Sequence, residues 1–126
     1  MNILFLGDIV GKPGRNIVFK YLKELKEKYP DTLTILPRAY EAGDEDGFKV
    51  VLSAVDEALV DQAIYEACKE KNIPVNIASD MTKNDFFFPA LICDDDMVIG
   101  VCSGGRDHKK VARISQLIRE KIFGNN

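Results

Sequence analysis

The sequence lacks several features that define large classes of proteins. It has a single histidine, no tryptophan, and three cysteines, Cys68, Cys93 and Cys102, none of them in a C-x-x-C pair. One histidine cannot build a histidine-rich metal centre, and an odd number of separated cysteines fits reduced thiols better than a disulfide framework or a zinc site. We therefore expect a cytoplasmic protein that has no metal site.

An excess of positive charge and a long apolar run are also missing. Lys and Arg number 17 and Asp and Glu number 20, so the net charge of −3 creates no basic field that would attract nucleic acid or an anionic membrane. No apolar run approaches the ~20 residues that cross a bilayer. The start of the chain also lacks the basic leader of a signal peptide. We expect neither nucleic acid nor a membrane among the partners.

The composition that remains is that of one globular domain, with 126 residues of which 46% are hydrophobic and 29% charged. Hydrophobic periodicity predicts strands at residues 3–7, 32–36, 48–54, 73–78, 86–92 and 97–102, and helices at 15–29, 57–71 and 108–123. Strands that alternate with helices predict an α/β fold, here a single Rossmann-like three-layer domain with a mostly parallel sheet. A first βα unit covers residues 1–30, later strands and a helix cover 31–105, and a last helix covers 106–123.

Apolar stripes predict which face of each helix is buried. The inward residues expected in the first helix are Ile17, Val18, Tyr21, Leu22 and Leu25. Those expected in the second helix are Leu59, Ala63, Ile64 and Ala67.

Polar residues follow four of the predicted strands. They are Gly7-Asp8, the segment from Ser53 to Asp56, Ser79-Asp80, and Ser103-Gly104-Gly105. Ligands bind beyond the carboxyl ends of the strands in open α/β sheets, and parallel strands end on one rim. The first three groups therefore predict a ligand site on that rim. For any one of these residues the alternative is ordinary loop chemistry, because loops favour Ser, Asp and Gly.

The turn after the first strand departs from the dinucleotide-binding fingerprint G-x-G-x-x-G. Its glycines, Gly7, Gly11 and Gly14, leave two residues too many before the second glycine, and Pro13 removes an amide donor. The turn still ends at a helix N-terminus, which favours an anion. The acid that contacts ribose about 20 residues further on is also missing. The sequence of this turn is therefore only weak evidence for a phosphate-binding site.

Six stretches of the later chain carry a resemblance to a known family. They are R-A-Y-E-A-G-D at 38–44, V-L-S-A-V-D at 51–56, I-P-V-N-I-A-S-D at 73–80, D-F-F-F-P-A at 85–90, M-V-I-G-V-C-S-G-G at 97–105 and I-R-E at 118–120. In this order and spacing they resemble the precorrin-2 dehydrogenase domain of siroheme synthases. The resemblance covers most of the chain from residue 31 onward.

The resemblance implies NAD-dependent oxidation of precorrin-2, an anionic tetrapyrrole, to sirohydrochlorin; some members also insert iron. Ser79 takes the position of the family's acid–base carboxylate, and Asp80 is next to it, so both are the candidate catalytic residues. The candidate NAD-binding residues are Gly7, Asp8, Gly11, Ser53 and Asp56. The candidate tetrapyrrole-binding residues are Asn76, Ser103 and Gly104.

The family's helical dimerisation segment is cut short in this chain. The aromatic run from Phe86 to Phe88 would then leave apolar surface uncovered, and we expect a homo-oligomer.

The first 28 residues resemble a different family. G-D-I-V-G at residues 7–11 is similar to the opening of a bacterial metallophosphoesterase family, in which the Asp, here Asp8, binds one of two metals. The rest of that metal site is absent, and one aspartate alone cannot hold two metals. The chain thus looks like a junction of two families. The alternatives to the dehydrogenase are a chimera that serves as a folded scaffold or interaction module without catalysis, and a metal-dependent phosphodiesterase.

Overall fold

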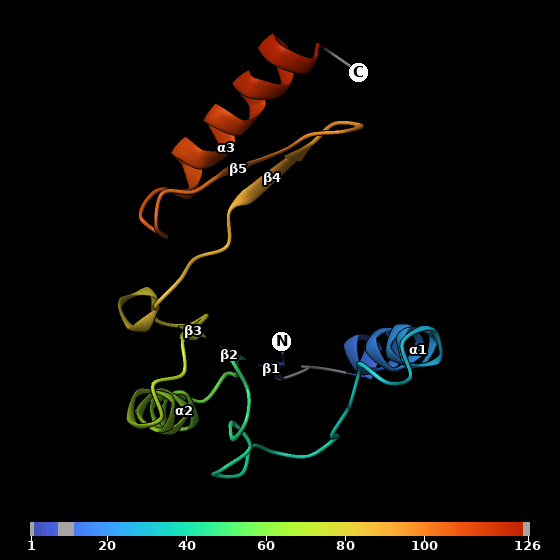
Figure 1. Ribbon diagram of the computed structural model, residues 1–126, viewed down its shortest axis with the longest axis vertical. Coiled ribbons are helices and arrows are strands. Elements are labelled where there is room, and N and C mark those ends of the chain that lie inside the picture. The colour runs from blue at the N-terminus through green and yellow to red at the C-terminus, as the bar shows by residue number, and fades with distance from the viewer. Residues whose placement is uncertain (1, 8–11, 125–126) are drawn as a thin grey trace.

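The computed structural model describes residues 2–7 and 12–124. Figure 1 shows a parallel sheet with two helices at one end of the molecule, and a hairpin with one helix at the other end. The elements of the first part are β1 (Ile3–Gly7), α1 (Lys12–Lys28), β2 (Val50–Ala54), α2 (Ala58–Glu70) and β3 (Val75–Ile77). The 3₁₀ turn η1 (Met81–Lys83) follows. The second part contains β4 (Ala90–Cys93), β5 (Val98–Val101), α3 (His108–Ile118) and the π turn η2 (Arg119–Phe123).

The sheet of the first part has the order β1-β2-β3, and both neighbouring pairs are parallel. In this register Gly7 lies opposite Ala54, and Ser53 lies opposite Ile77. The carboxyl ends of all three strands therefore meet at one edge, as the sequence predicted. With flanking helices this is the α/β, Rossmann-like arrangement expected. The described residues place β4 and β5 in a separate antiparallel pair, so the predicted strands do not all share one sheet.

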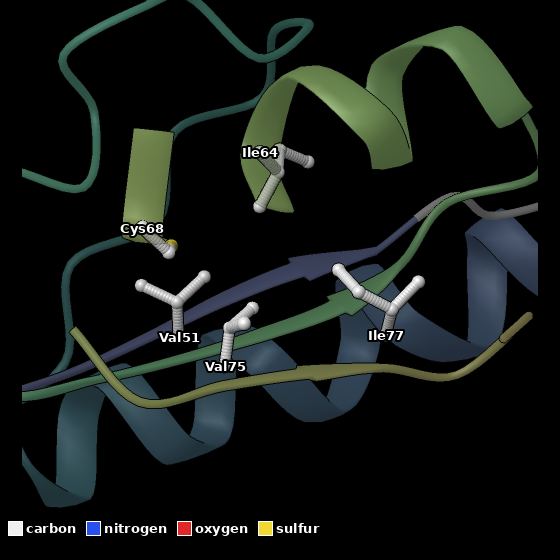
Figure 2. Packing of buried hydrophobic residues seen from close by; sticks show 5 residues of the cluster. All are labelled: Val51, Ile64, Cys68, Val75 and Ile77. Atoms are coloured by element: carbon white, nitrogen blue, oxygen red, sulfur yellow. The ribbon is translucent and has the colours of Figure 1, made fainter. Parts of the chain in front are cut away.

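The core lies between α2 and the sheet. Val51, Ile64, Cys68, Val75 and Ile77 are completely buried there, and Figure 2 shows their side chains pointing toward one another. Alternate strand residues share a face, which puts 51 of β2 and 75 and 77 of β3 under α2. Residues four apart share a helix face, which puts 64 and 68 above them. Each of the four aliphatic side chains contributes about 1.5–3 kcal/mol by leaving water.

The buried face of α2 differs from the prediction. Leu59 is 86% exposed and Ala63 is also exposed, whereas Ile64 is buried, as expected. The stripe that packs on the sheet runs instead through Val60, Ile64 and Cys68. A cysteine behaves as a small hydrophobic residue and completes this stripe. The prediction used aliphatic residues alone and therefore did not include it.

Helix α1 lies beside the β1 edge of the sheet, away from α2 (Figure 1). Val18 and Leu22 are half-buried, but Ile17, Tyr21 and Leu25 are exposed by 58%, 56% and 43%. The inward stripe predicted for this helix is therefore only partly covered.

The strand predicted at residues 32–36 does not form. The amides of Thr32 and Leu33 donate to the Tyr29 carbonyl, at 3.3 and 3.2 Å, in the turn that ends α1. Those donors are used locally and are not available to a strand ladder. Pro37, which has no amide, follows directly. The segment instead passes as irregular chain toward β2.

The two parts of the molecule meet where the turn after β5 approaches the connecting segment. A β-carbon built on Gly105 would lie 2.8 Å from the Phe87 ring and 3.7 Å from the Met81 Cβ. Gly105 has a φ of +75°, which disfavours any residue with a side chain. Glycine therefore allows the turn at 103–105 to lie against Phe87 and beside η1, which directly follows Ser79 and Asp80.

Candidate functional site

The strand-end rim contains most of the residues that the sequence analysis selected. Gly7 ends β1, Ser53 is the second-last residue of β2, and Asp56 follows β2 as an exposed side chain. Ser79 and Asp80 follow β3. The predicted Asp8 and Gly11 lie outside the described residues. The rim thus brings together residues from three neighbouring strand ends.

Asp61, in the first turn of α2, ties two of these strand ends together. Its carboxyl group is buried, at 2% exposure, and accepts hydrogen bonds from Ser53 Oγ at 2.6 Å and from Ser79 Oγ at 2.5 Å. The sequence analysis missed Asp61. Its signal was its place beside Val60 and Ile64 on the face of the helix that packs on the sheet, where an acidic residue needs hydrogen-bond donors.

Asp80 caps η1 with its side chain. Its Oδ1 accepts from the Thr82 hydroxyl at 2.6 Å and the Thr82 amide at 3.0 Å, and Lys83 Nζ lies 3.5 Å from its Oδ2. These bonds, the one from the Thr82 hydroxyl first, lower the pKa of the Asp80 carboxyl below its ordinary value. Asp80 is therefore a carboxylate at neutral pH. With 37% of its side chain exposed, it is open to a ligand and can accept a proton, but the hydrogen bonds that lower its pKa make it a weak base.

Asn76 holds the connecting segment against β3. Its side-chain amide donates to the Phe86 carbonyl at 2.9 Å. On the same edge the Ile77 amide donates to Asn84 Oδ1 at 2.5 Å, and the Val75 amide to Asp85 Oδ2 at 3.0 Å. Side chains and backbone of residues 84–86 thus occupy hydrogen-bonding groups at the β3 edge, and they fix the path of the chain to the hairpin.

The turn after β5 forms a second group of candidate residues. The Asp107 amide donates to Ser103 Oγ at 2.9 Å, and Arg106 Nε donates to the Ser103 carbonyl at 3.0 Å. Gly104 has a φ of +64°. A surface hollow of about 400 Å³, lined partly by Ser103, Arg106 and Lys110, opens at this turn. Two cationic side chains and one acidic side chain, Asp107, line it, so the cationic groups are in excess and can attract an anionic ligand.

The described residues hold no group of three or more His, Cys, Asp or Glu side chains that could bind a metal ion. No helix among the same residues is long and apolar enough to cross a membrane.

The rim residues fit a dinucleotide in chemistry and in place. Nucleotides bind at the carboxyl ends of parallel strands. At the end of β2 the Asp56 carboxylate is exposed, and a carboxylate there can accept hydrogen bonds from ribose hydroxyls. The fold and the rim together define a Rossmann-like α/β domain of the nucleotide-binding type.

A protein-family comparison agrees with this class. Residues 16–90, more than half of the chain, match the model of a family described as "Putative NAD(P)-binding". The chain belongs to this NAD(P)-binding family.

Individual relatives point in the same direction. The chain is 34% identical over 68 residues to a siroheme synthase of Methylococcus capsulatus, covering 54% of this chain and 14% of that protein. It is 36% identical over 77 residues to the siroheme biosynthesis protein met8 of Schizosaccharomyces pombe, covering 61% and 28%. Among solved structures it is similar to SirC, precorrin-2 dehydrogenase, with a TM-score of 0.66 and 14% identity over 94% of this chain and 65% of that one. The chain therefore spans only a part of the relatives that it matches.

Proposed function

We propose that this protein is an NAD-dependent oxidoreductase of siroheme biosynthesis that oxidises precorrin-2 to sirohydrochlorin. The observation that carries the proposal is the convergence of Ser79 and Asp80, at the end of β3, with the Ser103-Gly104-Gly105 turn beside η1. The names of the relatives, siroheme synthase and precorrin-2 dehydrogenase, support the same chemistry.

The reaction removes two electrons and two hydrogens from the tetrapyrrole, one hydrogen as hydride and one as a proton. Bound NAD⁺ supplies the hydride acceptor. Asp80, which its hydrogen bonds from Thr82 keep ionised, accepts the proton as a weak base. Ser103 and Gly104 contact the tetrapyrrole, and the cationic side chains of Arg106 and Lys110 in the adjoining hollow attract its carboxylates.

The remaining rim residues have supporting roles in this proposal. Gly7 and Asp56, with Asp8 and Gly11, contact the dinucleotide, whereas the predicted Ser53 is buried and supports the rim from beneath through its hydrogen bond to Asp61. Asn76 keeps residues 84–86 in place and so orients the turn that holds Ser79.

Anaerobic incubation of the purified protein with precorrin-2 and NAD⁺ tests the proposal. We expect NADH and sirohydrochlorin to form in equal amounts. An Asp80→Asn variant that binds both ligands should be strongly impaired. Absence of NADH formation by a folded wild-type protein, under conditions in which a relative of this family turns over, would refute the activity.

We also propose that the protein is a cytoplasmic homo-oligomer. Its three cysteines are free thiols. Apolar side chains are more than half exposed on the sheet face opposite α2, at Phe5, and on the hairpin, at Leu91 and Val98. A second copy of the chain that packs on these faces would bury them. Light scattering should give at least twice the chain mass at micromolar concentration, and a monomer would contradict this assignment.

We also propose that the first βα unit has a separate origin, as in a junction of two families. The sequence of residues 7–14 carries this proposal, because the family match over residues 16–90 already includes most of α1 and does not mark the boundary expected near residue 30. We expect that replacing residues 7–14 by a regular G-x-G-x-x-G turn strengthens NAD⁺ binding, measured by calorimetry. Weaker binding would show that the present turn is adapted to its nucleotide and would contradict the junction.

A further inference from the structure

The buried carboxylate of Asp61 contacts two of the strand ends that form the rim, and the proposed reaction does not use it. Its two oxygens accept from Ser53 Oγ and Ser79 Oγ. Within the described residues it forms no ion pair with a Lys, Arg or His side chain. Its only described side-chain partners are thus two hydroxyl groups, one at the end of each of two neighbouring strands.

The direction of these hydrogen bonds follows from the chemistry of the groups. A carboxylate only accepts, whereas a hydroxyl has one hydrogen and two lone pairs. Both serine hydroxyls must therefore donate their single hydrogen to Asp61. Ser53 is itself buried, at 2% exposure, so its lone pairs stay inside the protein. Residue Ser79 is exposed beyond the end of β3, and its lone pairs are available to a ligand.

We propose that Asp61 is a positioning residue that makes Ser79 a hydrogen-bond acceptor toward the rim. The ligand group that Ser79 recognises is then an N–H donor. This inference rests on the proposed function, in which such a group is present on both ligands: the carboxamide of nicotinamide and the pyrrole N–H groups of the tetrapyrrole. With a donor directed inward, Ser79 discriminates against a ligand group that only accepts.

An asparagine at position 61 keeps the shape of the side chain and changes which of its atoms donate and accept hydrogen bonds. Its oxygen can accept from one serine, while its NH₂ group donates to the other, whose hydrogen must then turn away. If that serine is Ser79, the rim receives a donor in place of an acceptor, and an N–H group of the ligand loses its partner. Leaving such a group unpaired weakens binding by about tenfold or more.

The experiment measures binding of NAD⁺, of ADP-ribose, which lacks the nicotinamide, and of sirohydrochlorin. Its variants are Asp61→Asn, Ser79→Ala, the double variant, and Glu66→Gln as a control that removes one negative charge from an exposed position on the same helix. We expect Asp61→Asn and Ser79→Ala each to weaken the binding of one ligand about tenfold. The double variant should be no worse than Ser79→Ala, within about twofold, since Asp61 acts through Ser79. Glu66→Gln should bind like the wild type.

The ligand affected identifies the contact. If a variant binds NAD⁺ more weakly and ADP-ribose normally, Ser79 contacts the carboxamide. If it binds sirohydrochlorin more weakly, Ser79 contacts the tetrapyrrole. Effects of the two single changes that multiply in the double variant would overturn the inference, because they would show that Asp61 acts independently of Ser79. If Asp61→Asn does not fold, the pair Ser79→Thr and Ser79→Ala decides. Threonine, which keeps the hydroxyl, should bind like the wild type, and normal binding by the alanine variant would overturn the inference.

These results separate the inference from the function on which it rests. A wild-type protein that binds NAD⁺ and sirohydrochlorin, with variants that bind equally well, refutes only the role of Asp61. A folded wild-type protein that binds neither ligand refutes both.

Discussion

Ile64 is the residue at which the stability of this small core can be tested most directly. Its side chain is completely buried between α2 and the sheet, where it packs with Val51, Cys68, Val75 and Ile77 (Figure 2). Ile64→Ala removes three carbon atoms. The loss of their transfer free energy is about 2.4 kcal/mol at ~0.8 kcal/mol per carbon. The cavity that remains raises the expected loss to about 3–4 kcal/mol.

A loss of this size is large for a domain whose total stability is about 5–15 kcal/mol. Urea unfolding followed by circular dichroism measures it as a fall in the free energy of unfolding. Leu59→Ala on the same helix is the matched control, because Leu59 is 86% exposed, and it should change the free energy of unfolding by less than about 0.5 kcal/mol. Equal losses in the two variants, or a loss below about 1 kcal/mol for Ile64→Ala, would refute the assignment of the buried face of α2.

Three further predictions concern a glycine turn, the ion pair of a buried glutamate and the candidate catalytic carboxylate. Gly105→Ala should lower the free energy of unfolding by more than Gly47→Ala does, since both positions have positive φ but only at Gly105 would the added β-carbon meet a neighbour, the Phe87 ring, at 2.8 Å; equal losses in urea titrations would contradict the contact. Glu45 is buried, and although burial raises its pKa, hydrogen bonds from Lys71 and Tyr40 lower the net pKa below the ordinary 4.5. Its contribution to stability is therefore present above pH 4.5 and is lost as the pH falls through the lower, folded-state pKa. In the Glu45→Gln variant the free energy of unfolding should fall less between neutral and acidic pH than in the wild type. An unchanged pH dependence would argue against the pairing of Glu45 with Lys71 and Tyr40. Asp80→Asn should lower kcat about 100-fold with little change in KM, and a parallel rise in KM at constant kcat would show that Asp80 binds the substrate and does not accept its proton.

Much of the strand-end rim could be predicted from sequence because it depends on local signals. Apolar runs that end in small and polar residues placed β1, β2 and β3, and their parallel pairing put those ends on one edge. The same signals failed at residues 32–36, whose apolar pattern suits a strand. There the amides of Thr32 and Leu33 close the turn after α1, and periodicity does not report that competition.

Asp61 could not be assigned from sequence for a different reason. In the chain it is one of several acidic residues near the start of a helix, a position that the helix dipole favours in any protein. Only the packing of α2 on the sheet brings it within hydrogen-bond distance of Ser53 and Ser79. The contact of Gly105 with Phe87 is similarly non-local, so the proximity of this glycine to η1, which follows Ser79 and Asp80, became visible only in three dimensions.

We propose that the carboxyl ends of β1, β2 and β3 form the nucleotide site. Hydrogen–deuterium exchange with and without NAD⁺ tests it most directly, because it reports which backbone amides a bound ligand protects. We expect protection at residues 54–57 and 78–80, with little change in β4 and along α2. Protection confined to the hairpin and α3, or no protection at saturating NAD⁺, would contradict it.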